Sequence, residues 1–130
     1  MAIVNSVKTL FPGAGNVTEY VSLLAQAVTA GTATAFTLTG FVNYVRSGKI
    51  RVKTTAAPAS STITGIVITG TDGTTTVTLG SYAYVATTAA QLVDLLFEFI
   101  SELNLTTVTV TITEAGGTAP TADIELAGNP

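Results

Sequence analysis

Alternating apolar and polar residues predict β-strands along most of the chain. In TTVTVTIT (106–113), Val108, Val110 and Ile112 would point toward a core and the threonines toward solvent. TITGIVIT (62–69) is apolar on both faces and predicts a central strand. The Asp72-Gly73 pair after it is typical of a two-residue hairpin turn of type I′. Further strands are expected within residues 32–46, 75–79, 81–86 and 122–126.

One segment shows helical spacing instead. Residues 88–103 predict an α-helix in which Thr88 and Gln91 form a capping box and Asn104 ends the helix. Apolar residues recur three and four positions apart, as on the buried side of a helix, and acidic residues recur four apart on the opposite side. The apolar stripe is Leu92, Leu95, Leu96, Phe99 and Leu103, and the acidic face is Asp94, Glu98 and Glu102.

The beginning of the chain is expected to differ from the rest. Residues 1–16 predict an extended N-terminal arm that ends in a Pro-Gly-Ala-Gly turn, followed by a single domain over 17–130. Residues 17–30 fit either a second helix, capped by Asn16 and Glu19, or a buried strand. The predicted fold is therefore mainly β: an antiparallel sandwich or barrel-like domain with an α-helix at about 88–103 and a second one at about 17–30 as an open alternative.

The composition points to a surface that contacts other proteins. Charged residues are 10% of the chain, against roughly 25% in an ordinary soluble domain, and threonine fills about a fifth of the positions. A surface this poor in charge suits a protein packed against neighbours, because charge repulsion normally keeps free monomers apart. The alternative is a small β domain in which threonine simply favours strands.

Several classes of function are not expected. With no His and no Cys, the chain has no imidazole base, no thiolate nucleophile and none of the usual zinc ligands, so we expect no enzyme, cofactor or metal. A calcium site built from Glu114, Asp123 and Glu125 would lack EF-hand spacing. The net charge of −3 argues against a nucleic-acid binder. The uncharged segment 20–45 is interrupted by polar residues, so no membrane span is expected, and the N-terminus lacks the pattern of an export signal.

Four of the five cationic side chains lie in RSGKIRVK (46–53). This segment predicts a hairpin with a turn at Ser47-Gly48, followed by a strand. Lys49, Arg51 and Lys53 would then point to one side of that strand, and Arg46 would lie just before the turn. We interpret the group as a surface that docks on an acidic partner, such as the Asp94, Glu98 and Glu102 face of a neighbouring copy. The alternative is protection of an edge strand by lysine.

The chain as a whole resembles small structural proteins of tailed-bacteriophage virions, especially capsid decoration (cement) proteins. The features that carry the resemblance are the arm MAIVNSVKTLFPGAGN, the Thr-, Ala- and Gly-rich strands such as TGIVITGTDGTTTVTL, and the lack of His, Cys and Trp. The resemblance implies a non-enzymatic oligomeric protein of the virion, with other copies of itself and a major capsid protein as partners. A tail-tube or other tail subunit, an adhesin or pilus-type subunit and a ligand-binding β domain are the alternatives.

Overall fold

The computed structural model describes residues 2–6, 18–54, 63–84, 93–116 and 120–130. In these residues the chain forms nine β-strands in two antiparallel sheets and no helix. The strands are β1 (Ala2–Ser6), β2 (Thr18–Ala27), β3 (Ala33–Leu38), β4 (Val45–Thr54), β5 (Ile63–Thr71), β6 (Thr76–Ala83), β7 (Asp94–Leu105), β8 (Thr107–Glu114) and β9 (Thr121–Asn129).

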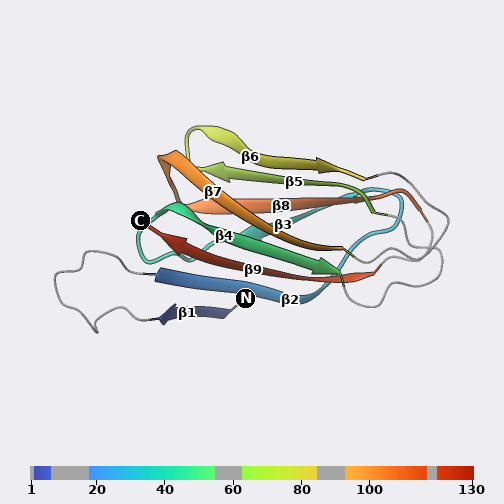
Figure 1. Cartoon of the computed structure of the whole chain (residues 1–130), viewed down its shortest axis with the longest axis horizontal. Coiled ribbons are helices and arrows are strands. Elements are labelled where there is room, and N and C mark those ends of the chain that lie inside the picture. The colour runs from blue at the N-terminus through green and yellow to red at the C-terminus, as the bar shows by residue number, and fades with distance from the viewer. Residues whose placement is uncertain (1, 7–17, 55–62, 85–92, 117–119) are drawn as a thin grey trace.

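The pairing of the strands is that of one long hairpin rolled into a sandwich (Figure 1). β2 pairs with β9, β3 with β8, β4 with β7 and β5 with β6, all antiparallel. Two further pairings, β4 with β9 and β5 with β8, join the rolled arms. The result is a five-stranded sheet, β1-β2-β9-β4-β7, and a four-stranded sheet, β3-β8-β5-β6. This nested order over β2 to β9 is a jelly roll, and β1 extends it at one edge.

The core lies between the two sheets, because every second residue of the inner strands points inward. In β8 the buried positions include Val108, Val110 and Ile112, which confirms the orientation predicted for this strand. β9 supplies Ala122, Ile124 and Leu126 from the opposite sheet. The other large apolar side chains that are fully buried are Val21, Leu38, Val45, Ile50, Val52, Ile63, Ile66, Ile68 and Leu105.

The helix predicted at 88–103 is wrong: from Asp94 to Leu105 the chain is strand β7, and residues 88–92 lie outside the described part. The segment also contains an alternating pattern, in which Leu95, Phe97 and Phe99 are more buried than their neighbours. Pairing with β4 satisfies the backbone groups on one side of β7, the edge strand of its sheet, and Phe97 packs against β6, where its ring meets that of Tyr82 edge-on at a centroid distance of 5.9 Å. Contacts with distant strands therefore override the helical spacing.

The open alternative at 17–30 is decided in favour of a strand. β2 pairs with both β1 and β9, and its register slips between Leu23 and Gln26. At the slip, Ala25 takes a positive φ of 53°, and its backbone N–H donates to Asp123 Oδ1 at 2.7 Å. Glu19, expected in a capping box, is instead buried and accepts a hydrogen bond from the backbone N–H of Val42.

Two predicted turns have different outcomes. The turn predicted at Ser47-Gly48 is wrong, because β4 runs through both residues without interruption. The turn at Asp72-Gly73 does connect β5 to β6, but as a four-residue loop over 72–75 in which Asp72 has no positive φ. Asp72 Oδ1 instead accepts the backbone N–H groups of Thr74 and Thr75 at 2.8 and 2.7 Å, which closes the turn through its side chain. Residues 55–62, between β4 and β5, lie outside the described part of the chain.

Candidate interaction surface

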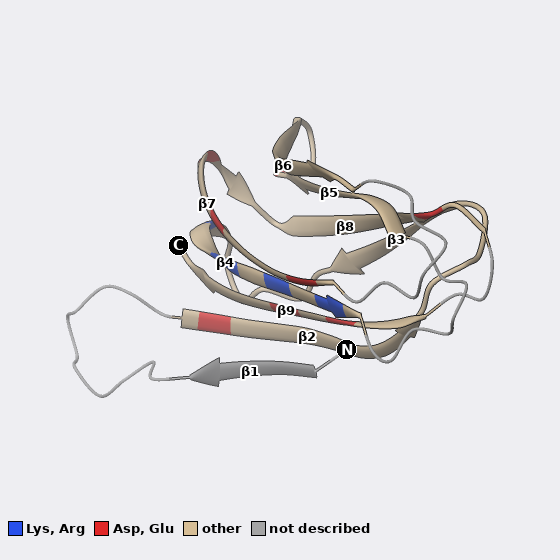
Figure 2. Cartoon of the chain, turned by 45° about the vertical axis from the view of Figure 1, so that its right-hand side comes forward, with Lys and Arg blue, Asp and Glu red and all other residues tan. Residues whose placement is uncertain are grey.

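Strand β4 places its cations in a row between two acidic strands of the five-stranded sheet. Lys49, Arg51 and Lys53, called the cationic stripe from here on, are exposed, while the alternate residues Ile50 and Val52 are fully buried. The predicted orientation of the three cations is therefore confirmed. In Figure 2 blue bands mark the Lys and Arg positions of β4, and red bands mark acidic positions on the neighbouring β7 and β9.

The strand register sets an acidic residue beside each member of the cationic stripe. On β7, Glu98 lies opposite Lys49 and Asp94 opposite Lys53. On β9, Glu125 lies opposite Arg51 and Asp123 opposite Lys53. The outward side chains of β7, β4 and β9 together form what we call the charged face. Its acids therefore lie next to the stripe in the same chain, as well as being available to a neighbouring copy.

Two ion pairs join β4 to β7 on the charged face. Lys49 Nζ lies 3.4 Å from Glu98 Oε1, and these side chains are 61% and 73% exposed. Arg51 makes a bidentate contact with Asp94, from Nε to Oδ1 at 3.0 Å and from Nη2 to Oδ2 at 2.8 Å. The hydrogen bonds from Arg51 lower the pKa of the Asp94 carboxyl, and Asp94 in turn raises the pKa of Arg51.

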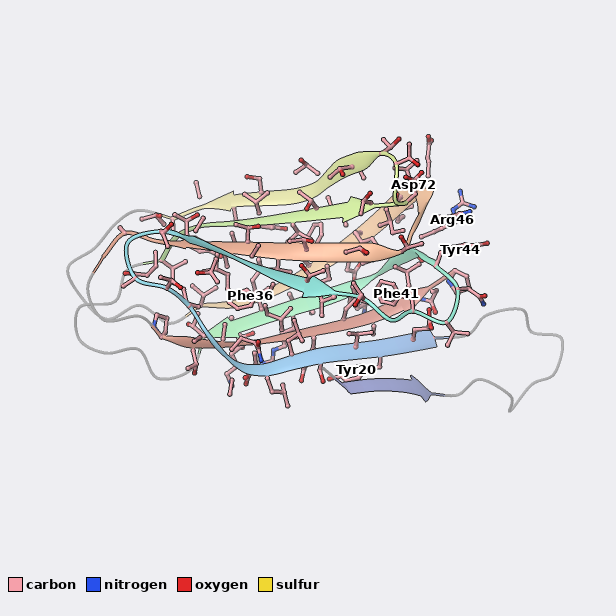
Figure 3. The ribbon with its side chains drawn as sticks, turned by 180° about the vertical axis from the view of Figure 1, so that it is seen from behind. Tyr20, Phe36, Phe41, Tyr44, Arg46 and Asp72 are labelled. Atoms are coloured by element: carbon pink, nitrogen blue, oxygen red, sulfur yellow. The ribbon has the colours of Figure 1, made fainter. Side chains whose placement is uncertain are left out.

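Arg46 and Glu102 lie beyond the cationic stripe. Arg46 lies at an irregularity in the β4–β7 register, and its Nη2 atom donates to the backbone oxygen of Glu102 at 3.4 Å. Figure 3 shows Arg46 projecting at the end of the sandwich where Tyr44 and Asp72 also lie. The structure therefore gathers the three cations of the stripe with Asp94 and Glu98, and leaves Arg46 and Glu102 at the periphery.

The charged face also carries exposed apolar side chains that the sequence interpretation missed. Leu96 is 64% exposed and Ile100 is 89% exposed, and both alternate with the acids of β7. Ile100 lines an open hollow of about 640 Å³, whose lining also includes the small residues Ser47, Gly48 and Ala127 and the charged pair Lys49 and Glu98. The helical interpretation placed Leu96 on a buried stripe. Its spacing of two from Asp94 and Glu98 was the available signal of an outward position on a strand.

Tyr20 borders the charged face on β2, where it lies opposite Ala127 of β9. Partial burial raises the pKa of its hydroxyl, and a hydrogen bond with Glu125 raises it further. This contact links Tyr20 on β2 to Glu125 on β9, and the hydroxyl remains protonated at neutral pH.

Two carboxyl groups, those of Glu19 and Glu114, are buried, and both accept hydrogen bonds from backbone N–H groups in loops. Glu114 is 1% exposed, and its Oε2 atom accepts the backbone N–H groups of Gly31 and Gly116, each at 3.0 Å. Glu19 holds the backbone of Val42 in the β3–β4 connection. Within the described residues, no group of three or more acids is placed to hold a metal ion. No helix long and apolar enough to cross a membrane occurs in that part of the chain.

Comparison with known proteins finds no matching family or curated sequence, but it does find structural similarity. No family model matches the chain, and no curated protein matches its sequence. The crystal structure of the STIV MCP, a viral major capsid protein, is similar over 85% of this chain and 47% of its own, with 14% identity and a TM-score of 0.42. The chain thus spans about half the length of that protein. The neighbour is a viral capsid protein and not a decoration protein of a tailed phage.

Proposed function

We propose that the chain is a non-catalytic structural subunit of a virus particle and, more narrowly, a decoration protein that binds an assembled shell. The observation that carries the proposal is the charged face, where Leu96 and Ile100 are exposed among matched charges. An apolar centre with a polar surround is the usual anatomy of a protein–protein interface. Exposed aliphatic side chains grouped on one sheet mark such a contact more than they mark a freely soluble surface.

The jelly roll agrees with this role but does not choose it alone, because the same architecture serves viral capsids, lectins and cupins. The residues of this chain favour assembly. It contains no His or Cys to hold an imidazole- or thiolate-ligated metal and no Trp. The large apolar side chains exposed in the described part are Leu24, Val42, Leu96 and Ile100, which are aliphatic and suit a protein contact better than stacking on a sugar or base.

The partner that fits the charged face is a protein surface. A nucleic acid that approached the cationic stripe would also meet Asp94 and Glu98 on one side and Asp123 and Glu125 on the other. These carboxylates repel phosphate, so the face lacks the net positive field on which nucleic-acid binding depends. We therefore propose other copies of the chain and a major capsid protein as its partners, in the virion.

The test is to purify virus particles from the source of the sequence on a density gradient and to measure this chain by mass spectrometry. A constant copy number across the particle fractions is expected, and absence from them would refute a virion role. Particles are then washed at high salt. Release of the chain from intact shells supports a decoration protein, whereas collapse of the shell assigns it to the shell wall. Retention on isolated tails would assign it to the tail.

A further inference from the structure

The charges of β4 and β7 are arranged so that the two strands complement each other row by row. Lys49 lies beside Glu98, and Lys53 lies beside Asp94. Between these rows Arg51 lies beside Leu96, and at the end of the series Ser47 lies beside Ile100. Two of these rows therefore place a cation next to an acid. The other two place an exposed aliphatic side chain next to the long side chain of Arg51 or the small one of Ser47.

This arrangement is self-complementary under a two-fold rotation. Consider a two-fold axis that runs parallel to the strands and lies between β4 and β7. Rotation about this axis places β4 of the second copy over β7 of the first, and every residue keeps its position along the strand direction. When a second copy is related by that axis, each β7 residue faces the β4 neighbour of its own row in the other copy. Glu98 then faces Lys49 of the second copy, Asp94 faces Lys53, and Ile100 faces Ser47.

The apolar part of the charged face fits the same arrangement. Ile100, which is 89% exposed, would enter the hollow above Ser47, Gly48 and Ala127 in the second copy, and the reverse contact would form by symmetry. Leu96 would cover the aliphatic stem of Arg51. A slip of two residues along the strands would instead set Ile100 against Lys49, so the register is specified as well as the face.

We propose that the charged face binds a second copy of this chain and forms a closed, two-fold symmetric dimer whose axis lies between β4 and β7. Because acids and cations share one face, the contact is isologous and stops at two copies, in contrast to an open head-to-tail array. Packed sheets lie about 10 Å apart with strands crossing at about 30°, so the rows nearest the point where the facing strands cross match best. The dimer does not depend on the virion role.

The position of the axis follows from the exposed aliphatic side chains. An axis between β4 and β7 brings both copies of Leu96 and Ile100 close to the centre of the contact. An axis on the other side of β4, between β4 and β9, would also match charges, but it would move Ile100 toward the rim. Apolar groups contribute most where water is fully excluded, so the first axis is favoured.

The ion pairs within one chain leave the charged side chains of the face able to bind further partners. Lys49 and Glu98 remain 61% and 73% exposed, and an ammonium group has three donors while a carboxylate has about four acceptor sites. In the dimer each of them gains an opposite charge from the second copy. The result is one set of four alternating charges, Lys49 and Glu98 from each copy, in a drier environment, where such contacts are stronger than on an open surface.

The test is sedimentation velocity on the purified chain over a range of concentrations at low and moderate salt. A dimer that reaches a plateau and weakens with salt is expected. Ile100→Asp should weaken dimerisation about a hundredfold or more, because the change occurs twice in each dimer. Val42→Asp is the matched control, because Val42 is also well exposed, at 63%, but lies outside the charged face. The dissociation constant of the dimer should be the same in this variant as in the original chain.

Charge reversal locates the axis. Glu98→Lys should weaken the dimer about tenfold, and adding Lys49→Glu should restore it, since both the internal pair and the pair between copies are rebuilt. Glu125→Lys, on the other side of the cationic stripe, should have little effect. A concentration-independent monomer, open-ended growth, equal responses of the Ile100 and Val42 variants, or sensitivity to Glu125→Lys but not Glu98→Lys would each overturn the proposal. Circular dichroism confirms that each variant is folded.

Discussion

The two sheets of the sandwich present opposite kinds of surface to solvent. The five-stranded sheet carries the cationic stripe with acids on both sides, joined by two exposed ion pairs. The strands of the four-stranded sheet contain a single charged residue, Glu114, and it is buried. Outward positions there are occupied mainly by threonine, in rows that run across strands, such as Thr37, Thr109, Thr69 and Thr78.

This difference shows how a chain with few charges uses them. Both sheets bury alternate residues in one core, so their inner faces obey the same rule. Charge on the outside is not needed for folding, and the threonine-covered sheet shows that β-branched polar residues suffice there. Charges spread evenly would serve solubility. Their concentration on β4, β7 and β9 is the basis of the interaction surface proposed above.

The largest difference between the sheets is expected in the stability lost when a glycine within a strand of each sheet is replaced by alanine. A Cβ at Gly48 in β4 would lie 2.4 Å from the backbone oxygen of Ala127 and 2.9 Å from Gly128 Cα, so Gly48→Ala forces β4 away from β9. We expect a loss of about 3 kcal/mol in the free energy of unfolding.

Gly65→Ala in β5 is the control, because its nearest contact would be an ordinary 3.5 Å to the oxygen of Tyr82. Its stability should change by no more than about 1 kcal/mol. Urea unfolding of both variants makes the comparison, and equal losses would show that the close approach of β4 to β9 is unimportant.

A smaller effect is expected from removing a carboxyl group from each sheet. Glu114→Ala would leave the backbone N–H groups of Gly31 and Gly116 without their buried acceptor, at a cost of about 2 kcal/mol. In the monomer, Glu98→Ala removes only an exposed ion pair and should change the free energy of unfolding by about 0.5 kcal/mol or less. Thermal unfolding at pH 7 measures both. A larger loss for Glu98→Ala would reverse the roles assigned to the two carboxyl groups.

The smallest expected effect is a difference between two carboxyl groups, Asp94 and Asp72, whose pKa values are both lowered but by different interactions. Arg51 lowers the pKa of Asp94, and the backbone N–H groups of Thr75 and Thr74 lower that of Asp72. Each group therefore stabilises the fold above the unfolded carboxyl pKa of about 3.9, and this contribution is lost as pH falls through the lower folded value.

Salt distinguishes the two causes. Carboxyl NMR titration in about 1 M salt should move the pKa of Asp94 toward its usual value, because ions screen the exposed Arg51 pair. The pKa of Asp72 should move less, since short backbone hydrogen bonds hold its carboxylate. Arg51→Ala should raise the pKa of Asp94 alone. Equal salt responses of the two carboxyls would contradict this assignment.

Local patterns in the sequence determined the features that need only the geometry of one strand or one turn. Strict alternation set the buried side of β8, the pleat aligned the cationic stripe, and the Asp72-Gly73 pair marked the connection of β5 to β6. These outcomes depend on residues two to four positions apart, whose relation is set by the backbone itself.

Tertiary structure decided the features that depend on distant partners. The segment 94–105 fits both a helix and a strand, and pairing with β4 and contact with β6 select the strand. Gly48 became part of β4, against the predicted turn, because β9 packs closely against it. The same pairing carried Asp94 and Glu98 to the cationic stripe more than 40 positions away in sequence. Hydrogen bonding between strands is nonlocal, so no short window of sequence could reveal that the charged face lies within one chain.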